Sequence, residues 1–103
     1  MSPRSTPFLA FVAAEWAAIG PALAAQNFVF QIHISAGLRK LAIEIETPTH
    51  VALVEAWEHA NCLDATVMDA RSLASTMLAA GPCTSEAQVS ERLAALCARL
   101  QAS

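Results

Sequence analysis

The chain has 103 residues, a net charge of −3 and an isoelectric point near 5.5. This length predicts one domain, residues 1–103, with a single core. Charged residues make up only 15% of the chain, against about a quarter in typical globular domains. The one basic pair is Arg39–Lys40, and nucleic-acid binding needs several clustered cations, so we expect no such partner. A surface with so few charges must expose apolar area, which favours a partner-binding or self-association site.

The first 25 residues predict an amphipathic helix. Thr6 followed by Pro7 is a hydroxyl cap with proline at the first helical position. Apolar residues then recur at a spacing of three to four; they are Phe8, Val12, Trp16, Ile19 and Leu23. Phe11 lies beside this stripe, and Gly20-Pro21 is expected to end or kink the helix.

The same residues resemble a signal peptide in part. Arg4, the apolar run 8–14 and the triplet Ala22-Leu23-Ala24 imitate its three regions. Glu15 interrupts the apolar run, however, and the helical period continues through it, so a helix of the domain is favoured. The chain has no uncharged apolar stretch long enough to predict a membrane span. We therefore expect a cytoplasmic protein with no membrane partner.

From residue 28 the hydrophobic period changes from 3.6 to two, which is typical of a β-hairpin. Gly37 lies in the turn, where glycine can take a positive φ. The predicted buried face carries Phe28, Phe30, Ile32, Ile34, Leu41, Ile43 and Ile45. The predicted polar face carries Gln31, His33, Lys40, Glu44 and Glu46.

The chain is predicted to contain the same unit twice, a hairpin followed by a helix. The first unit ends with a helix over 51–59, and the second unit follows it. Thr47-Pro48 repeats the cap-plus-proline pattern and predicts a helix over 51–59, with Val51, Val54 and Trp57 inward. Residues 63–69 and 76–80 predict a second hairpin with 71–74 as its loop. Ser85 with Gln88 forms a capping-box pattern before a final helix over 86–101.

These elements predict an α+β fold in the order αββαββα. The four strands would form one antiparallel sheet from two hairpins, with the three helices packed on it. Any such sheet has two edge strands with unpaired backbone groups, which invite pairing with another chain. We therefore expect a homodimer, formed through a sheet edge or through apolar helix surface.

The three cysteines, Cys62, Cys83 and Cys97, are odd in number and widely spaced, which is typical of reduced thiols acting as small hydrophobic residues. On the predicted 51–59 helix, Glu55 and His59 would be neighbours, with Cys62 shortly after them. Zinc usually needs a further ligand pair, so we predict no metal site. Cys83 precedes a helix N-terminus, which favours thiolate, but no base can be assigned to it from the sequence.

The acidic residues give no catalytic arrangement either. Glu44 and Glu46 share an exposed strand face, and Asp64 and Asp69 flank a strand. Such carboxylates are nearly always solvated unless one of them is buried. We therefore predict no catalytic residue and no cofactor.

The two tryptophans, Trp16 and Trp57, are each predicted to anchor a helix on the sheet. Tryptophan is also enriched at binding hot spots. Trp57 is the better candidate for an interface because it neighbours Glu58. The predicted partner interface consists of Trp57, Phe11 and Glu58.

Together these observations predict a small acidic protein, not an enzyme, that binds another protein. The element order resembles that of the dimeric chaperones of type III secretion, with one central strand fewer, and this resemblance implies an adaptor. An inhibitor or immunity-type protein is the other form. Alanine is abundant and arginine outnumbers lysine, which suggests a GC-rich bacterial source. The alternative is a small-molecule or metal-binding domain with weak thiol or metal chemistry, built on His33, His59 and the cysteines.

Overall fold

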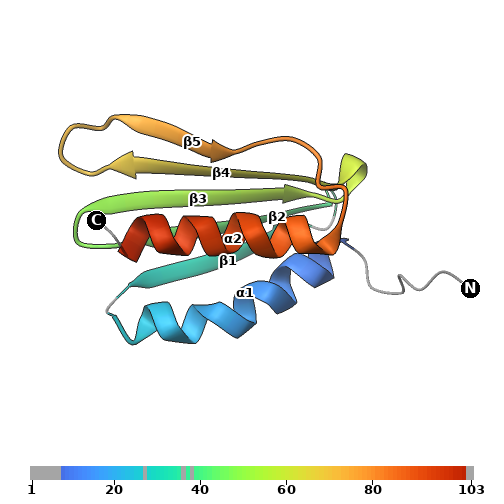
Figure 1. The fold of residues 1–103 in the computed structure, drawn as a ribbon, viewed down its shortest axis with the longest axis horizontal. Coiled ribbons are helices and arrows are strands. Elements are labelled where there is room, and N and C mark those ends of the chain that lie inside the picture. Colours follow the sequence, from blue (N-terminus) through green and yellow to red (C-terminus); the bar gives the residue numbers. More distant parts are fainter. Residues whose placement is uncertain (1–7, 27, 36, 38, 102–103) are drawn as a thin grey trace, which may run out of the picture.

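The computed structural model describes residues 8–26, 28–35, 37 and 39–101. Helix α1 and helix α2 flank five strands in the chain. The elements are α1 Phe8–Ala24, β1 Val29–Ser35, β2 Lys40–Glu46, β3 His50–Trp57, the 3-10 turn η1 His59–Asn61, β4 Cys62–Asp69, β5 Ser75–Ala79 and α2 Glu86–Gln101. The strands form one antiparallel sheet in the order β1-β2-β3-β4-β5, and both helices lie on the same face of it (Figure 1).

The predicted α+β class is confirmed, but the predicted order αββαββα is wrong at its centre. The described residues form five strands and two helices, because residues 50–57 are strand β3 and not a helix. Every second residue of β3 is buried, starting from His50, with Ala52, Val54 and Ala56 inward. The two alanines hid this period of two, because alanine is a good helix former and a poor strand former.

The Thr47-Pro48 pattern forms a tight turn between β2 and β3 and not a helix cap. The Thr47 hydroxyl oxygen accepts the backbone N–H groups of Thr49 and His50, at 3.2 and 2.9 Å. The Thr47 N–H in turn donates to the carbonyl of His50 at 2.9 Å. A threonine oxygen that accepts N–H groups two and three residues ahead is equally suited to a helix start and to a turn. The strand that follows decides between them.

Helix α1 continues through Gly20-Pro21 to Ala24, so of the two predicted outcomes, an end or a kink at this pair, the end is wrong. Trp16 is fully buried and meets Phe30 of β1 edge-on, with ring centroids 5.4 Å apart. A Cβ atom at Gly20 would lie 3.0 Å from the Phe30 ring, so glycine allows the helix to approach β1 at this point. The predicted Thr6-Pro7 start lies outside the described residues.

The alternation of faces predicted for the first hairpin is observed, but the burial predicted for Ile32 and Ile34 is wrong. Residues of β1 and β2 pair in a continuous register that sets Ile32 opposite Ile43 and Ile34 opposite Leu41. Leu41, Ile43 and Ile45 are fully buried beneath the helices. Ile32 and Ile34 share their face but remain 42% and 68% exposed, because β1 is the edge strand. The helix layer therefore leaves the far end of β1 uncovered.

The second hairpin and the last helix agree with their predicted positions. A register shift between Ala65 and Thr66 interrupts the pairing of β4 with β5. On α2 the buried residues are Val89, Leu93, Leu96 and Leu100. The Arg92 guanidinium donates to the carbonyls of Leu63, Gly81 and Pro82, at 2.9, 2.7 and 3.1 Å. These bonds fasten α2 to the sheet beyond its hydrophobic contacts.

Substitution of Ile43 by lysine should unfold or aggregate the protein. Ile43 is fully buried in the core cluster, and an unpaired buried charge costs about 3–5 kcal/mol against a total stability of about 5–15 kcal/mol. The matched variant Glu44→Lys should fold, because Glu44 is exposed on the other face. Thermal unfolding followed by circular dichroism compares the two. Equal melting temperatures would contradict the assignment of faces.

Candidate partner interface

The face of the sheet opposite the helices carries an exposed apolar strip across β3, β4 and β5. Strand pairing sets Leu53 beside Thr66 and Thr66 beside Met77, with Val51 beside Met68 in the next row. Val51 is 36% and Met77 60% exposed, and the other two apolar residues are half-buried. The open-face strip is Val51, Leu53, Met68 and Met77. Contiguous apolar residues at the surface mark partner sites more often than isolated ones do.

Acidic residues flank this strip on β2. Glu44 lies opposite Leu53, and Glu46 lies opposite Val51. Both glutamates are exposed, and Glu44 contacts His33 of β1 with Oε1 and Nε2 3.0 Å apart. The sequence predicted the polar character of this hairpin face. The apolar strip was missed, because β3, which carries Val51 and Leu53, was predicted as a helix.

Trp57 ends the open face at the far end of β3. The ammonium of Lys40 lies 4.5 Å from the centre of the indole ring and also forms an ion pair with Glu55. A cation over the face of a tryptophan ring is attracted by about 0.5–1 kcal/mol at an exposed site. Trp57 is therefore half-buried and held in place, but on a strand and not on the predicted helix.

The other two predicted interface residues lie in different parts of the structure. Glu58 follows Trp57 directly and is half-buried beside the η1 turn. Phe11 lies on α1 and packs against the core from the helix layer. The structure therefore places Trp57 and Glu58 together and Phe11 apart from them.

The predicted neighbourhood of Glu55, His59 and Cys62 does not exist, because it required a helix over 51–59. Glu55 lies on β3 with its carboxylate paired to Lys40, and His59 lies in the η1 turn. Among the described residues, no group of three or more histidine, cysteine or acidic side chains could hold a metal ion.

The cysteines are free thiols. Burial raises the pKa of the Cys83 thiol, although the nearby Arg92 charge acts in the opposite direction. Burial also raises the pKa of Cys97. The thiolate that the helix dipole was expected to favour at Cys83 is therefore disfavoured, because loss of solvation is the larger effect.

A second polar cluster joins the β2–β3 turn to the β4–β5 turn. One carboxylate oxygen of Asp69 accepts the backbone N–H groups of Arg71 and Ser72, both at 2.8 Å. The other lies 3.9 Å from Nε2 of the buried His50, whose Nδ1 is 2.8 Å from the Thr49 hydroxyl. The backbone hydrogen bonds, together with His50, lower the pKa of Asp69.

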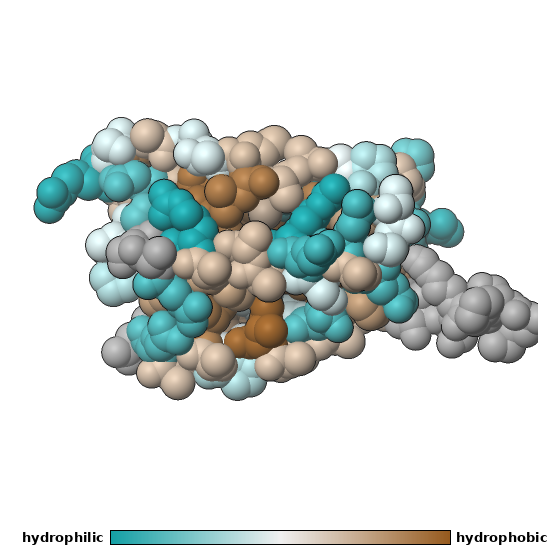
Figure 2. All heavy atoms as spheres, viewed as in Figure 1, coloured by the Kyte–Doolittle hydropathy of each residue, from teal (hydrophilic) through white to brown (hydrophobic). Residues whose placement is uncertain are grey.

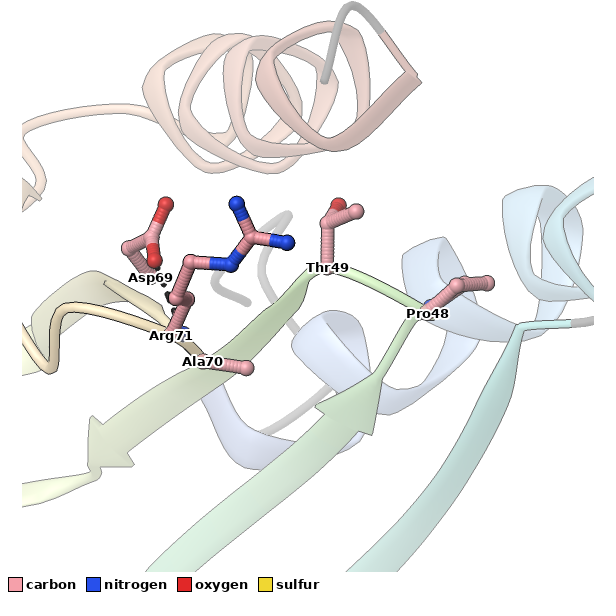
Figure 3. A pocket seen from close by; sticks show the side chains of 5 residues that line it. All are labelled: Pro48, Thr49, Asp69, Ala70 and Arg71. Carbon is pink, nitrogen blue, oxygen red and sulfur yellow. Dashed lines mark hydrogen bonds between the residues drawn. The ribbon is translucent and has the colours of Figure 1, made fainter.

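This cluster borders a shallow depression of about 390 Å³ lined by Pro48, Thr49, Asp69, Ala70 and Arg71. Figure 3 shows the side chains of Thr49, Asp69 and Arg71 pointing to the same side. The series formed by the Thr49 hydroxyl, the His50 imidazole and the Asp69 carboxylate resembles a catalytic triad. The 3.9 Å gap exceeds hydrogen-bond length, however, and the hydroxyl belongs to the residue next to the histidine. The contacts shown here join two turns. In the sequence, these two turns could have been recognised from the patterns Thr-x-Thr-His at 47–50 and Asp-Ala-Arg-Ser at 69–72.

Comparison with known proteins identifies no relative: no protein-family model matches the chain, and no curated protein or solved structure matches it significantly. Over the described residues, neither helix combines the length and apolar character needed to cross a membrane. Conclusions about function therefore depend on the residues and surfaces of this chain alone.

Replacement of Asp69 by alanine should lower the melting temperature at neutral pH but have little effect in strong acid. The folded-state pKa of Asp69 lies below the ordinary value of 3.8. Its stabilising contribution is therefore fully present above that value and is lost as the pH falls through the folded-state pKa. Melting curves of both proteins across this range test the expectation, with Asp69→Asn, which keeps a hydrogen-bond acceptor, as the control. A loss of stability independent of pH would contradict it.

Proposed function

We propose that this protein is a non-enzymatic binding module that holds another protein against the open face of its sheet. The observation that carries the proposal is the open-face strip, Val51, Leu53, Met68 and Met77, which is exposed on the side of β3 and β4 that faces away from their buried residues and continues onto β5. Nothing in the fold of the monomer requires these apolar side chains to be exposed. Binding of a partner would account for them, because it removes their area from water.

The charges around the strip support a partner with basic residues. Among the described residues, four carboxylates lie on the open face, at positions 44, 46, 55 and 64, and Lys40 is the one lysine or arginine there. Lys40 is already paired with Glu55. Complementary potentials speed association and fix orientation across an interface. A segment with apolar residues on one side and cations beside them matches both features of this face.

This function can take two forms. An adaptor of the secretion-chaperone type would hold a segment of its client, whereas an inhibitor or immunity-type protein would cover a folded partner. Three free cysteines are consistent with action in the reducing cytoplasm of a bacterial cell. Binding to an isolated partner segment would support the adaptor, and binding that requires the folded partner would support the inhibitor.

The double substitution Val51→Lys/Met77→Lys should weaken binding of the partner at least about tenfold, which corresponds to about 1.4 kcal/mol. Both side chains are exposed, at 36% and 60%, so the fold should survive. The measurement is affinity capture from the native host, followed by mass spectrometry and titration of the captured protein. Leu73→Lys is the matched control, because Leu73 is 66% exposed but lies in the β4–β5 turn. A partner retained by the double variant would contradict the proposal.

Replacement of Cys62, Cys83 and Cys97 together by alanine should leave partner capture intact. A binding module needs no thiolate, and burial already disfavours ionisation of Cys83 and Cys97. Lost packing at Cys97 should reduce the stability by about 1 kcal/mol, so the melting temperature must be measured beside binding. A folded triple variant that captures nothing would favour the alternative of a domain with thiol or metal chemistry.

A further inference from the structure

The flank of the molecule formed by α1 and β1 is almost free of charge. Between residues 8 and 35, Glu15 is the single acidic or basic residue apart from His33. The Glu15 carboxylate accepts a hydrogen bond of 2.9 Å from Ser90 of α2, so it faces the neighbouring helix. The exposed positions of α1 are largely alanines, and the lower part of Figure 2, over α1, is largely tan and brown. The uncharged surface that the low charge content predicts is thus found mainly on this flank.

Strand β1 forms the edge of the sheet on that flank. Its seven residues pair with β2 without a bulge, and its outer side has no strand partner within the part of the chain that the structure describes. Proteins usually protect such an edge with lysine, proline, a bulge or a very short strand. The β1 sequence, VFQIHIS, has none of these features. The opposite edge, β5, has five residues and a register shift beside it, and so is better protected.

The exposed side chains of β1 add an apolar component to this edge. Ile32 and Ile34 are 42% and 68% exposed although they share the face on which the helices pack. The helices therefore leave room at this edge for further apolar contacts. A second strand placed beside β1 would satisfy its free backbone groups and cover both isoleucines.

We propose that two copies of this chain pair through β1, antiparallel and centred on Ile32, to form a homodimer with one continuous sheet. A twofold axis perpendicular to the sheet sets residue 32 opposite itself, Phe30 opposite Ile34 of the second copy, and Gln31 opposite His33 of the second copy. Apolar side chains meet apolar ones on the helix side, and on the open side Gln31 meets His33, with Val29 opposite Ser35 at the ends. This register uses all seven residues of the strand and brings no like charges together.

The same symmetry explains the uncharged surface of α1. A perpendicular axis leaves the helices of both copies on one side of the joined sheet, so the two α1 surfaces approach each other beside the paired strands. Alanine side chains allow close approach without an unpaired charge. The open faces then lie side by side on the other surface, each with its own strip and neither covered. The dimer therefore does not depend on the proposed partner binding.

A lysine at position 34 tests the edge. Sedimentation equilibrium at micromolar concentration should give twice the chain mass of 10.9 kDa for the wild-type protein and a single chain mass for Ile34→Lys. Met77→Lys is the matched control: Met77 is 60% exposed on the other edge strand, so this variant should remain a dimer even if it loses its partner. A monomeric wild-type protein, or a monomeric Met77→Lys beside a dimeric Ile34→Lys, would overturn the proposal.

Cysteine substitutions test the register without disturbing the strand. Ile32→Cys should form a disulfide between chains on mild oxidation, because directly opposite residues have Cβ atoms about 4.5–5.5 Å apart. Ile34→Cys should form little or none, because its two copies would be separated by four residues along the strand, or about 14 Å. This control is the more exposed position, and the wild-type protein accounts for the native thiols. Equal cross-linking at both positions would exclude this register.

Discussion

Two helices cover one face of a five-stranded sheet, and the burial of alternate strand residues beneath them is the interaction on which the rest of the structure depends (Figure 1). Ile43, Val54 and Leu63 are fully buried in this layer. Each such side chain contributes roughly 1.5–3 kcal/mol relative to remaining exposed. Because successive strand residues alternate, fixing one face inward fixes the other outward. The open face is therefore a consequence of the core.

What distinguishes this open face is its chemistry. A sheet exposed on one side normally alternates apolar residues inward with polar ones outward. Strands β1 and β2 follow this rule almost throughout, whereas β3 places Val51 and Leu53 outward. Met77 does the same on β5. These outward apolar residues thus lie on β3, β4 and β5, next to carboxylates that the structure does not need for its core.

The two proposed interfaces occupy different parts of the molecule and differ in character. The β1 edge is uncharged and self-complementary, which suits a second copy of the chain. The open face carries a surplus of carboxylates, so two copies placed face to face would bring like charges together. The two proposed surfaces therefore differ in charge: the uncharged one suits self-association, and the acidic one suits a different partner. Both arise from a chain whose small number of charges is unevenly distributed.

The sequence alone determined the α+β class, the faces of the first hairpin and the last helix. Those segments have a regular period and clear ends: Ile43 and Glu44 alternate, and Ser85 accepts the Gln88 N–H as a cap. It did not determine β3, because Ala52 and Ala56 weaken the period and Thr47 suits a turn as well as a helix. Only pairing with β2 and β4 on both sides makes residues 50–57 a strand. The same holds for the surfaces: the sequence indicated that apolar area must be exposed, and the tertiary structure decided where, because the helices cover one face and stop short of the β1 edge.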